Sequence, residues 1–192
     1  MFCMENKTYL KRFFLHLHKI NRHKRIVTGL CFKCGMISQG IKHDLSKYTP
    51  VEFFAGVKYY QGFRSPIDAE KADKGYSLGW LHHEGRNRHH WEHWIDKNYS
   101  NYDLFVLNMP FNYLLESILD RIAASKNYNP NYTDSSPLEF FDNGKDRHFM
   151  GEENCRRVRL LLKYLADNGE HEAIKYYKSL YKKWKKDKSF DI

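Results

Sequence analysis

The sequence predicts an all-α fold, organised as one helical domain over residues 1–192. Apolar residues recur at three- and four-residue steps along most of the chain, and proline-containing helix-start signals appear more than once. No segment of length alternates apolar and polar residues as a strand does. The chain has 192 residues, 42% of them hydrophobic, which suits one core and is too short for two ordinary domains.

The first three helices follow from apolar spacing and start signals. One apolar stripe predicts a helix from Thr8 to about Cys34, which Gly35 or Gly40 should break or bend. A second helical segment should cover residues 37–45. A third should begin at residues 49–52 (TPVE), where Thr caps the helix, Pro occupies its first turn and Glu completes a capping box.

The later helices follow the same rules. The sequence SPID predicts a helix from Ser65 to about Glu84, and Pro110 begins another with a strongly apolar stripe. Residues 127–150 are rich in Asn, Pro, Asp, Ser and Gly in their first part and should form a loop. Two helices, at about 152–167 and 170–187, should close the chain.

Histidine dominates the chemistry of the middle of the chain. Neutral imidazoles bury poorly without partners and charged ones repel one another, so crowded histidines need a reason. Metal binding supplies one, because imidazole is the commonest metal ligand and helices can project several ligands into one pocket. The alternative is a polar surface turn. The crowded residues are His82, His83, His89, His90 and His93.

A His-Asp pair forms the second candidate element. His43 and Asp44 offer an imidazole nitrogen and a carboxylate that can bridge two cations, and Lys47 lies close enough to reach an anionic group. His23 precedes the pair on the first helix and Asp120 follows on a later one. The result is a series of His, His-Asp and Asp with every member on a helical segment.

This order of residues resembles the HD-domain superfamily of metal-dependent phosphohydrolases. Their signature is a His, a His-Asp pair often continued as HDxxK, and a distant Asp; the dinuclear branches add histidines between the pair and the last Asp. The segments HDLSKYTPVEFF, HHxxxNxHHWExW and MPFxYLLE are similar to a small family of uncharacterised bacterial and phage proteins. The resemblance spans roughly residues 23–120. The GYP-type loop of the cyclic-di-GMP hydrolases is missing, so their substrate does not carry over.

The resemblance implies an HD-like domain with its metal-site core at about 8–125. It implies one or two divalent transition-metal ions, with Mn, Fe, Co, Ni or Zn suiting imidazole and carboxylate ligands. The expected ligands are His23, His43, Asp44, His82, His90 and Asp120. Alternatives stay open: His16 for His23, and His83 or His89 for its neighbour, because adjacent residues on a helix cannot both point inward. Glu116, one turn before Asp120, is a candidate to orient a ligand.

The favoured function is a metal-dependent phosphodiesterase or phosphomonoesterase acting on a nucleotide or related small phosphate ester. Two cations about 3.5–4 Å apart lower the pKa of a bridging water and clamp both oxygens of an in-line displacement. Asp44 and Lys47 are the expected catalytic residues, with Lys47 stabilising the developing charge. The substrate-binding candidates are Lys47, Arg86, Asn87 and Arg121.

Two other interpretations use the same residues. Some members of the superfamily are diiron oxygenases that cleave C–C or C–P bonds. A non-catalytic helical binding module could instead hold a structural metal and contact nucleic acid or a partner through its basic terminal helix. Structural zinc sites usually close with four ligands, whereas this chain offers six or more, which favours an enzyme.

Charge and cysteine content narrow the choice of partner and compartment. The net charge is +9, and residues 171–192 form a basic amphipathic helix. We expect this helix to dock on the body through Ile174, Tyr177, Leu180, Tyr181 and Trp184, with a solvated Lys face, so nucleic acid is not the favoured partner.

Four cysteines are too few for a disulfide scaffold, and Cys31 and Cys34 are expected to be packed free thiols rather than a zinc site. Lacking a membrane-spanning apolar run and a secretory signal, the protein is expected in the cytoplasm.

Overall fold

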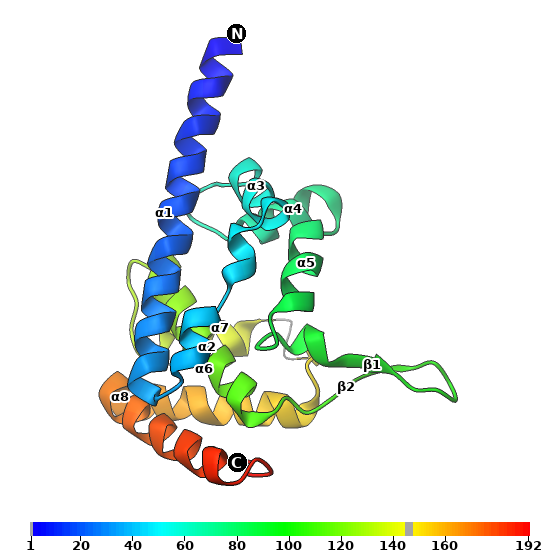
Figure 1. Ribbon diagram of the computed structural model, residues 1–192, viewed down its shortest axis with the longest axis vertical. Helices are drawn as coiled ribbons and strands as arrows, with labels where there is room; N and C mark the ends of the chain where they lie inside the picture. Colours follow the sequence, from blue (N-terminus) through cyan, green and yellow to red (C-terminus); the bar gives the residue numbers. More distant parts are fainter. Residues whose placement is uncertain (1, 145–147) are drawn as a thin grey trace.

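The computed structural model describes residues 2–144 and 148–192 and confirms the predicted helical fold. Apart from one small two-stranded hairpin, the described residues form a mostly helical single domain (Figure 1). The elements in order are α1 (Phe2–Cys34), α2 (Ile37–Lys42), the 3-10 turn η1 (Leu45–Tyr48), α3 (Pro50–Lys58), α4 (Pro66–Lys74), α5 (Leu78–Arg86), the 3-10 turn η2 (Trp91–Trp94), β1 (Ile95–Lys97), β2 (Leu104–Val106), α6 (Phe111–Tyr128), α7 (Ser136–Asn143) and α8 (Glu152–Lys186).

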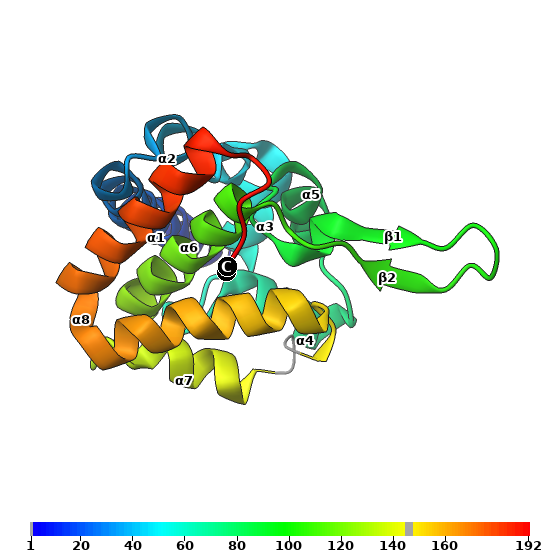
Figure 2. The ribbon, with the colours of Figure 1, turned by 90° about the horizontal axis from the view of Figure 1, so that it is seen from below.

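Helix α6 lies at the centre of the main core. It packs against α1 and α8, and α1 and α8 also contact each other, as the view from below shows (Figure 2). The apolar stripe predicted from Leu114 to Ile122 is completely buried in this core. Helices α3, α4 and α5 form a second group that joins the body through the contact of α3 with α1. The N-terminal end of α1 stands away from the body (Figure 1).

The C-terminal helices take the positions that the sequence predicts. Gly169 has a φ of +77° and divides α8 into two helical parts that run in different directions (Figure 2). Ile174, Tyr177 and Leu180 are buried, and the Tyr177 hydroxyl donates to the carbonyl of Leu161. Tyr181 and Trp184 pack against the same core. The predicted apolar stripe is therefore a core face.

Glycines decide where two of the helices end. Gly35 has a φ of +82° and ends α1, as predicted. The single helix predicted from Ser65 to Glu84 is wrong, because Gly75 ends α4 at a φ of +80°. Helix α5 then begins anew after Ser77, whose hydroxyl accepts from the Trp80 amide. A glycine in the left-handed conformation, followed two residues later by a capping serine, thus ends one helix and begins the next.

Gly40, the other glycine considered as a helix breaker, has a packing role instead. It lies inside α2, where a Cβ would come within 2.7 Å of the Cys31 Cβ atom. The missing side chain lets α2 lie directly on α1, where the Thr28 hydroxyl donates to the Gly40 carbonyl at 2.9 Å. Helix α2 is consequently fixed against α1 immediately before the His-Asp pair.

Helix α3 begins at Pro50 as predicted, but the predicted capping box does not form. The Thr49 hydroxyl donates to the Ser46 carbonyl instead of capping α3. Glu52 turns away from the helix start and accepts hydrogen bonds from His82 and His83. Two imidazole donors, brought close by tertiary packing, replace one backbone amide as the partners of this carboxylate.

The sequence pattern does not predict two of the elements, α7 and the hairpin of β1 and β2. The stretch predicted as a loop contains α7, which begins at a Ser-Pro pair, and residues 145–147 of that stretch lie outside the described part of the chain. The hairpin of β1 and β2 projects from the body (Figures 1 and 2), and its three-residue strands are too short to show alternation.

The remaining sequence expectations concern thiols and membranes. Cys31 and Cys34 are free and buried in the core, as expected, and burial raises the pKa of the Cys34 thiol to about 12. The side chain of Cys3 lies outside the described residues. Within the described ranges, no helix combines the length and the apolar character needed to cross a bilayer.

Two glycine-to-alanine variants test the packing of α2 on α1. Gly40→Ala should lower the free energy of unfolding by about 1–3 kcal/mol, because the added methyl group overlaps Cys31. Gly29→Ala, within α1, meets no atom within 4 Å and should raise it by about 0.5–1 kcal/mol through helix propensity. Urea unfolding measures both. Equal changes in the free energy of unfolding for the two variants would contradict the close approach of α2 to α1.

Candidate metal centre

Three overlapping groups of buried or half-buried side chains meet where α1, α5 and α6 converge on the His-Asp pair. In each group, one potential ligand atom per residue lies within 4.8 Å of the others. The first group is His23, His43, Asp44 and Asp120; the second is Asp44, His83, His89 and His90; the third is His43, His89 and Glu116. Asp44 belongs to both four-membered groups.

The carboxylate of Asp44 stands between the first two groups. Its Oδ2 atom lies 3.1 Å from His43 Nε2 and 3.7 Å from His23 Nε2. Its Oδ1 atom lies 3.3 Å from His83 Nε2 and 3.4 Å from His89 Nε2. One oxygen thus faces each set of imidazoles, so this carboxylate could contact a cation on either side.

The backbone around the pair places this carboxylate. Helix α2 ends at Lys42, His43 leaves the helical conformation with a ψ of 126°, and Asp44 adopts a left-handed conformation with a φ of 53°. Such a conformation is uncommon outside glycine, although Asp and Asn adopt it more readily than most residues. Lys24 fixes the preceding segment, because its ammonium group donates to the carbonyls of Gly40, Ile41 and His43. The prediction that Asp44 lies within a helix is wrong.

The two ends of the HD-type series meet across the core. His23 on α1 and Asp120 on α6 approach to 2.9 Å between Nε2 and Oδ1. The same Asp120 oxygen lies 3.4 Å from His43 Nε2. Residues separated by almost a hundred positions therefore share one small volume with the central pair.

Two further carboxylates hold the imidazole rings from behind. Glu116 accepts from His43 Nδ1 at 2.9 Å and lies 3.3 Å from His89 Nδ1, and it accepts a bond from Gln39. Glu52 accepts from His83 Nδ1 at 2.8 Å. Each bond leaves the Nε2 atom of its ring facing the centre. Carboxylates behind ligating histidines are a regular feature of metal sites, where they fix the ring and its tautomer.

Several atoms at the centre have no hydrogen-bond partner, although they are buried. Buried polar atoms in native proteins are nearly always paired, so a group of unpaired ones needs an explanation. Five of the unpaired buried atoms belong to the imidazoles and the carboxylate of the centre, where a cation could coordinate them. They are His23 Nε2, His43 Nε2, Asp44 Oδ1, His89 Nε2 and His90 Nε2. The donor set of imidazole and carboxylate therefore fits a divalent transition metal.

The electrostatics of the centre favour added positive charge. Burial alone would raise the pKa values of Asp44 and Asp120, but neighbouring histidines outweigh it and hold both pKa values well below their usual range. Glu116 has its pKa lowered to about 2 despite burial, chiefly by its bonds from His43 and His89. Burial opposes a charge on His43, yet the adjacent Asp44 raises its pKa well above 6.5. Carboxylates stay ionised, so protons or metal ions must balance them.

The structure brings together five of the six predicted ligands. These are His23, His43, Asp44, His90 and Asp120. His82, the sixth, lies outside the three groups and donates to Glu52 at 2.6 Å, while its neighbour His83 faces the centre. His16 is buried against Gly56 and also lies outside the groups.

His89 and His90 both reach the centre, which the sequence argument excluded for helical neighbours. They lie in the turn that follows α5, not on a helix, so the helical rule does not apply to them. Asn87 shapes this turn, because its side-chain amide donates to Ser46 and to the carbonyl of His83. The rule does hold for His82 and His83, which lie on α5.

A cavity of about 740 Å³ opens onto the centre, and we call it the metal cavity. Of the substrate-binding candidates, Lys47 and Arg121 line it, while Arg86 and Asn87 are not among its lining residues. Lys47 Nζ lies 2.5 Å from Asp44 Oδ2. Apolar and aromatic side chains make up much of the remaining wall, among them Phe63, Trp80, Trp91, Tyr128 and Phe140.

The fold and the site together define a mostly helical protein with a buried His/Asp/Glu group that could hold metal ions. The chain belongs to DUF5662, a family of unknown function whose model matches residues 12–164. The match covers every residue of the three groups. No curated protein and no solved structure gives a significant match to the chain.

Removing the shared carboxylate tests the centre. We expect Asp44→Ala to strip bound transition metal, because both four-membered groups lose a member. Unfolding should also occur at lower temperature, since metal bound only to the folded state adds RT ln(1 + [L]/Kd) to stability. Mass spectrometry of protein prepared without a histidine tag measures occupancy. Asp142→Ala, which breaks an exposed pair with Arg159, is the control, and full occupancy in Asp44→Ala would exclude this residue as a ligand.

The raised pKa of His43 predicts how metal and pH interact. A histidine whose pKa is raised in the folded state stabilises metal-free protein below about pH 6.5, and this stability is lost as the pH rises toward the folded pKa. Metal displaces that proton, so the metal-bound protein should not show the loss. Added Mn or Zn should therefore raise the unfolding midpoint more at pH 8 than at pH 6.5. A shift that is smaller at pH 8 would contradict this assignment.

Proposed function

We propose that the protein is a metal-dependent phosphohydrolase with a dinuclear centre of the HD type. The observation that carries this proposal is the position of Asp44, whose two oxygens face two separate sets of imidazoles. The first set, with Asp120, corresponds in order to the HD signature. The second set occupies the stretch where dinuclear members of that superfamily have their additional histidines.

In this proposal, each four-membered group holds one ion. His23, His43, Asp44 and Asp120 would hold the first ion, and Asp44, His83, His89 and His90 the second. Two such ions would supply an activated water as the nucleophile and would stabilise the negative charge on the attacking and leaving oxygens of an in-line phosphoryl displacement. Glu116 and Glu52 keep the rings in place from outside the two groups.

Lys47 supplies a fixed positive charge at the cavity wall. Burial would lower its pKa, but the carboxylates of Asp44 and Asp120 raise it above its usual range, so the side chain stays an ammonium. Its Nζ atom lies beside Asp44 and also lines the metal cavity. A phosphoryl oxygen entering from the cavity would meet this ammonium group, which can stabilise the charge that develops on phosphorus.

The cavity wall supports an organic phosphate as substrate. Trp80, Trp91 and Tyr128 offer flat apolar surfaces for a base or another ring, while Lys19 and Arg121 add cations around the same space. A nucleotide or related phosphate ester has this combination of parts.

The cavity also separates this proposal from one of its alternatives. A structural metal site is closed by its ligands, whereas this centre adjoins a large cavity, which argues against a purely structural role. The diiron-oxygenase alternative would use the same imidazoles and the same HDxxK lysine, so an assay for phosphate-ester hydrolysis, rather than the ligand set, separates it from the phosphohydrolase.

The function is tested by screening nucleotides and generic phosphodiesters with added Mn. We expect Lys47→Ala to keep the fold and the metal but to lower kcat by about 10²-fold, the scale for losing one charge-stabilising donor. Lys42→Ala, which removes an exposed lysine from the same segment, is the matched control. Unchanged kcat/KM in Lys47→Ala would assign this lysine a structural role, and the absence of hydrolysis with every metal and ester would refute the proposed activity.

A further inference from the structure

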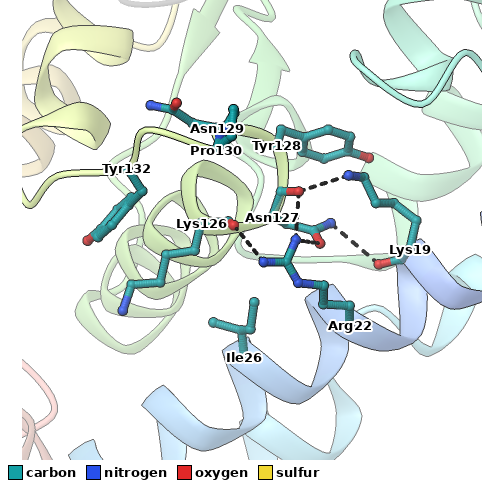
Figure 3. A pocket seen from close by; sticks show the side chains of 9 residues that line it. All are labelled: Lys19, Arg22, Ile26, Lys126, Asn127, Tyr128, Asn129, Pro130 and Tyr132. Atoms are coloured by element: carbon teal, nitrogen blue, oxygen red, sulfur yellow. Dashed lines mark hydrogen bonds between the residues drawn. The ribbon is translucent and has the colours of Figure 1, made fainter.

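A second pocket of about 640 Å³ lies where α1 meets the C-terminal end of α6, and we call it the outer pocket. Figure 3 shows its lining side chains around the last turn of α6 and the segment that follows. Its lining residues are Lys19, Arg22 and Ile26 of α1, Lys126, Asn127 and Tyr128 of α6, and Asn129, Pro130 and Tyr132.

The outer pocket is cationic. Lys19, Arg22 and Lys126 line it, and none of its lining residues is a carboxylate. The Lys126 ammonium also pairs with Glu170 on α8, outside the lining set. Two full charges remain unbalanced by any acid in the wall. The pocket therefore has the character of an anion site.

The contacts within the pocket leave donors free for a ligand. Lys19 Nζ donates to the Asn127 carbonyl at 2.8 Å, and Arg22 donates to the carbonyls of Asn127 and Lys126 at 3.0 and 3.2 Å (Figure 3). These bonds satisfy the end of α6, but a carbonyl carries only a partial negative charge. An ammonium has three donors and a guanidinium five, so neither side chain is saturated.

The crowding of these cations supports the same conclusion. The pKa of Lys19 is lowered, first by burial and then by the charge of Arg22 nearby. An anion placed between the two would relieve this repulsion. Tyr128 adds a surface for an organic group, since the Lys19 ammonium lies 4.6 Å from the centre of its ring.

The outer pocket shares a wall with the metal cavity. Lys19, Asn127, Tyr128, Asn129 and Pro130 line both. The same two helices connect the pockets through the chain, because Arg22 precedes the ligand His23 on α1 and Asn127 lies two turns after Asp120 on α6. These common residues place the outer pocket next to the metal cavity.

We propose that the outer pocket binds a second phosphate of the substrate. The substrate class is then an extended phosphate ester with at least two anionic groups, such as a short 5′-phosphorylated oligonucleotide, rather than a compact monophosphate. This inference rests on the proposed function, which places the scissile phosphate over the metal centre. The shared wall favours one extended substrate over a separate regulatory anion.

Two probes with one and two phosphates test the proposal with metal-loaded protein. Bis(4-nitrophenyl) phosphate has one phosphate, and 5′-phosphorylated thymidine dinucleotide has two. We expect Arg22→Gln to raise KM for the dinucleotide about tenfold or more. Lys126→Gln should raise it less, because this ammonium already pairs with Glu170, and KM for the one-phosphate probe should stay unchanged in both variants. Lys175→Gln, which breaks an exposed pair with Glu172 on α8, should change neither.

The second variant, Lys126→Gln, separates a structural effect on α6 from a loss of ligand binding. Arg22 bonds to the end of α6, so Arg22→Gln can shift the helix, whereas the Lys126 ammonium bonds to Glu170 rather than to the backbone. Thermal unfolding checks that both variants fold. KM values that rise equally for both probes, or for neither, would overturn the second-phosphate site.

Binding without turnover separates this inference from the proposed function. Fluorescence anisotropy with a labelled, phosphorothioate-linked dinucleotide measures affinity directly. Loss of affinity in both variants, in a protein that hydrolyses no probe, would support the outer pocket and refute the phosphohydrolase. Hydrolysis of both probes with variant-independent KM and affinity would support the enzyme and refute the outer pocket.

Discussion

The buried carboxylate of Asp44 is the constraint on which the rest of the site depends. It is almost completely removed from solvent, and burying an ionised carboxylate costs several kcal/mol unless positive charge offsets it. Four imidazole groups from different parts of the chain contact this carboxylate: His23 from α1, His43 from its own segment, His83 from α5 and His89 from the turn that follows α5. Lys47 alone is a permanent cation among these contacts. The arrangement is balanced only when protons or metal ions occupy the space between these rings, which ties the fold of this region to what it binds.

Much of the helical packing serves to hold those rings. Glu116 reaches His43 and His89 from α6, and Glu52 reaches His83 from α3. Helix α3 thus contributes to the centre without supplying a member of the ligand groups. Its apolar contact with α1, through Phe53 and Val57 against Ile20, holds the helix that carries this carboxylate. Lys24 acts from the other side by fixing the carbonyls before Asp44. The centre is consequently supported by α1, α3, α5 and α6 together, and a shift of any one of them would move a ring.

The sequence alone predicts features that depend on the local spacing of residues. It does not predict features that depend on contacts with residues far away in the chain. The stripe of α6 and the order His23, His43, Asp44, Asp120 are visible because periodicity and motif spacing are properties of the chain itself. Glu52 shows the limit. It fits a capping box three residues after Thr49, but its true partners lie 30 residues away on α5. The choice between His82 and His83 depends on the rotation of α5, which only packing fixes. Gly75 carried a usable signal, because a glycine followed by a capping serine ends one helix and begins another.

The side chains of the centre differ in how far they are exposed to solvent, so its two sides are not equivalent. The Asp44 side chain is 2% exposed, whereas that of Asp120 is 18% exposed and that of Lys47 is 27% exposed, and both of these line the metal cavity. One side of the centre is therefore sealed by helices and the other opens toward a space large enough for an organic ligand. Sealing keeps competing water away from the Asp44 carboxylate and strengthens its interactions, while the open side connects the centre to the metal cavity. A site built only for stability would have no use for the second property. Lys47 and Asp120 stand on this open side, and Lys19 lines both the metal cavity and the outer pocket, so the proposed second-phosphate site adjoins the same space.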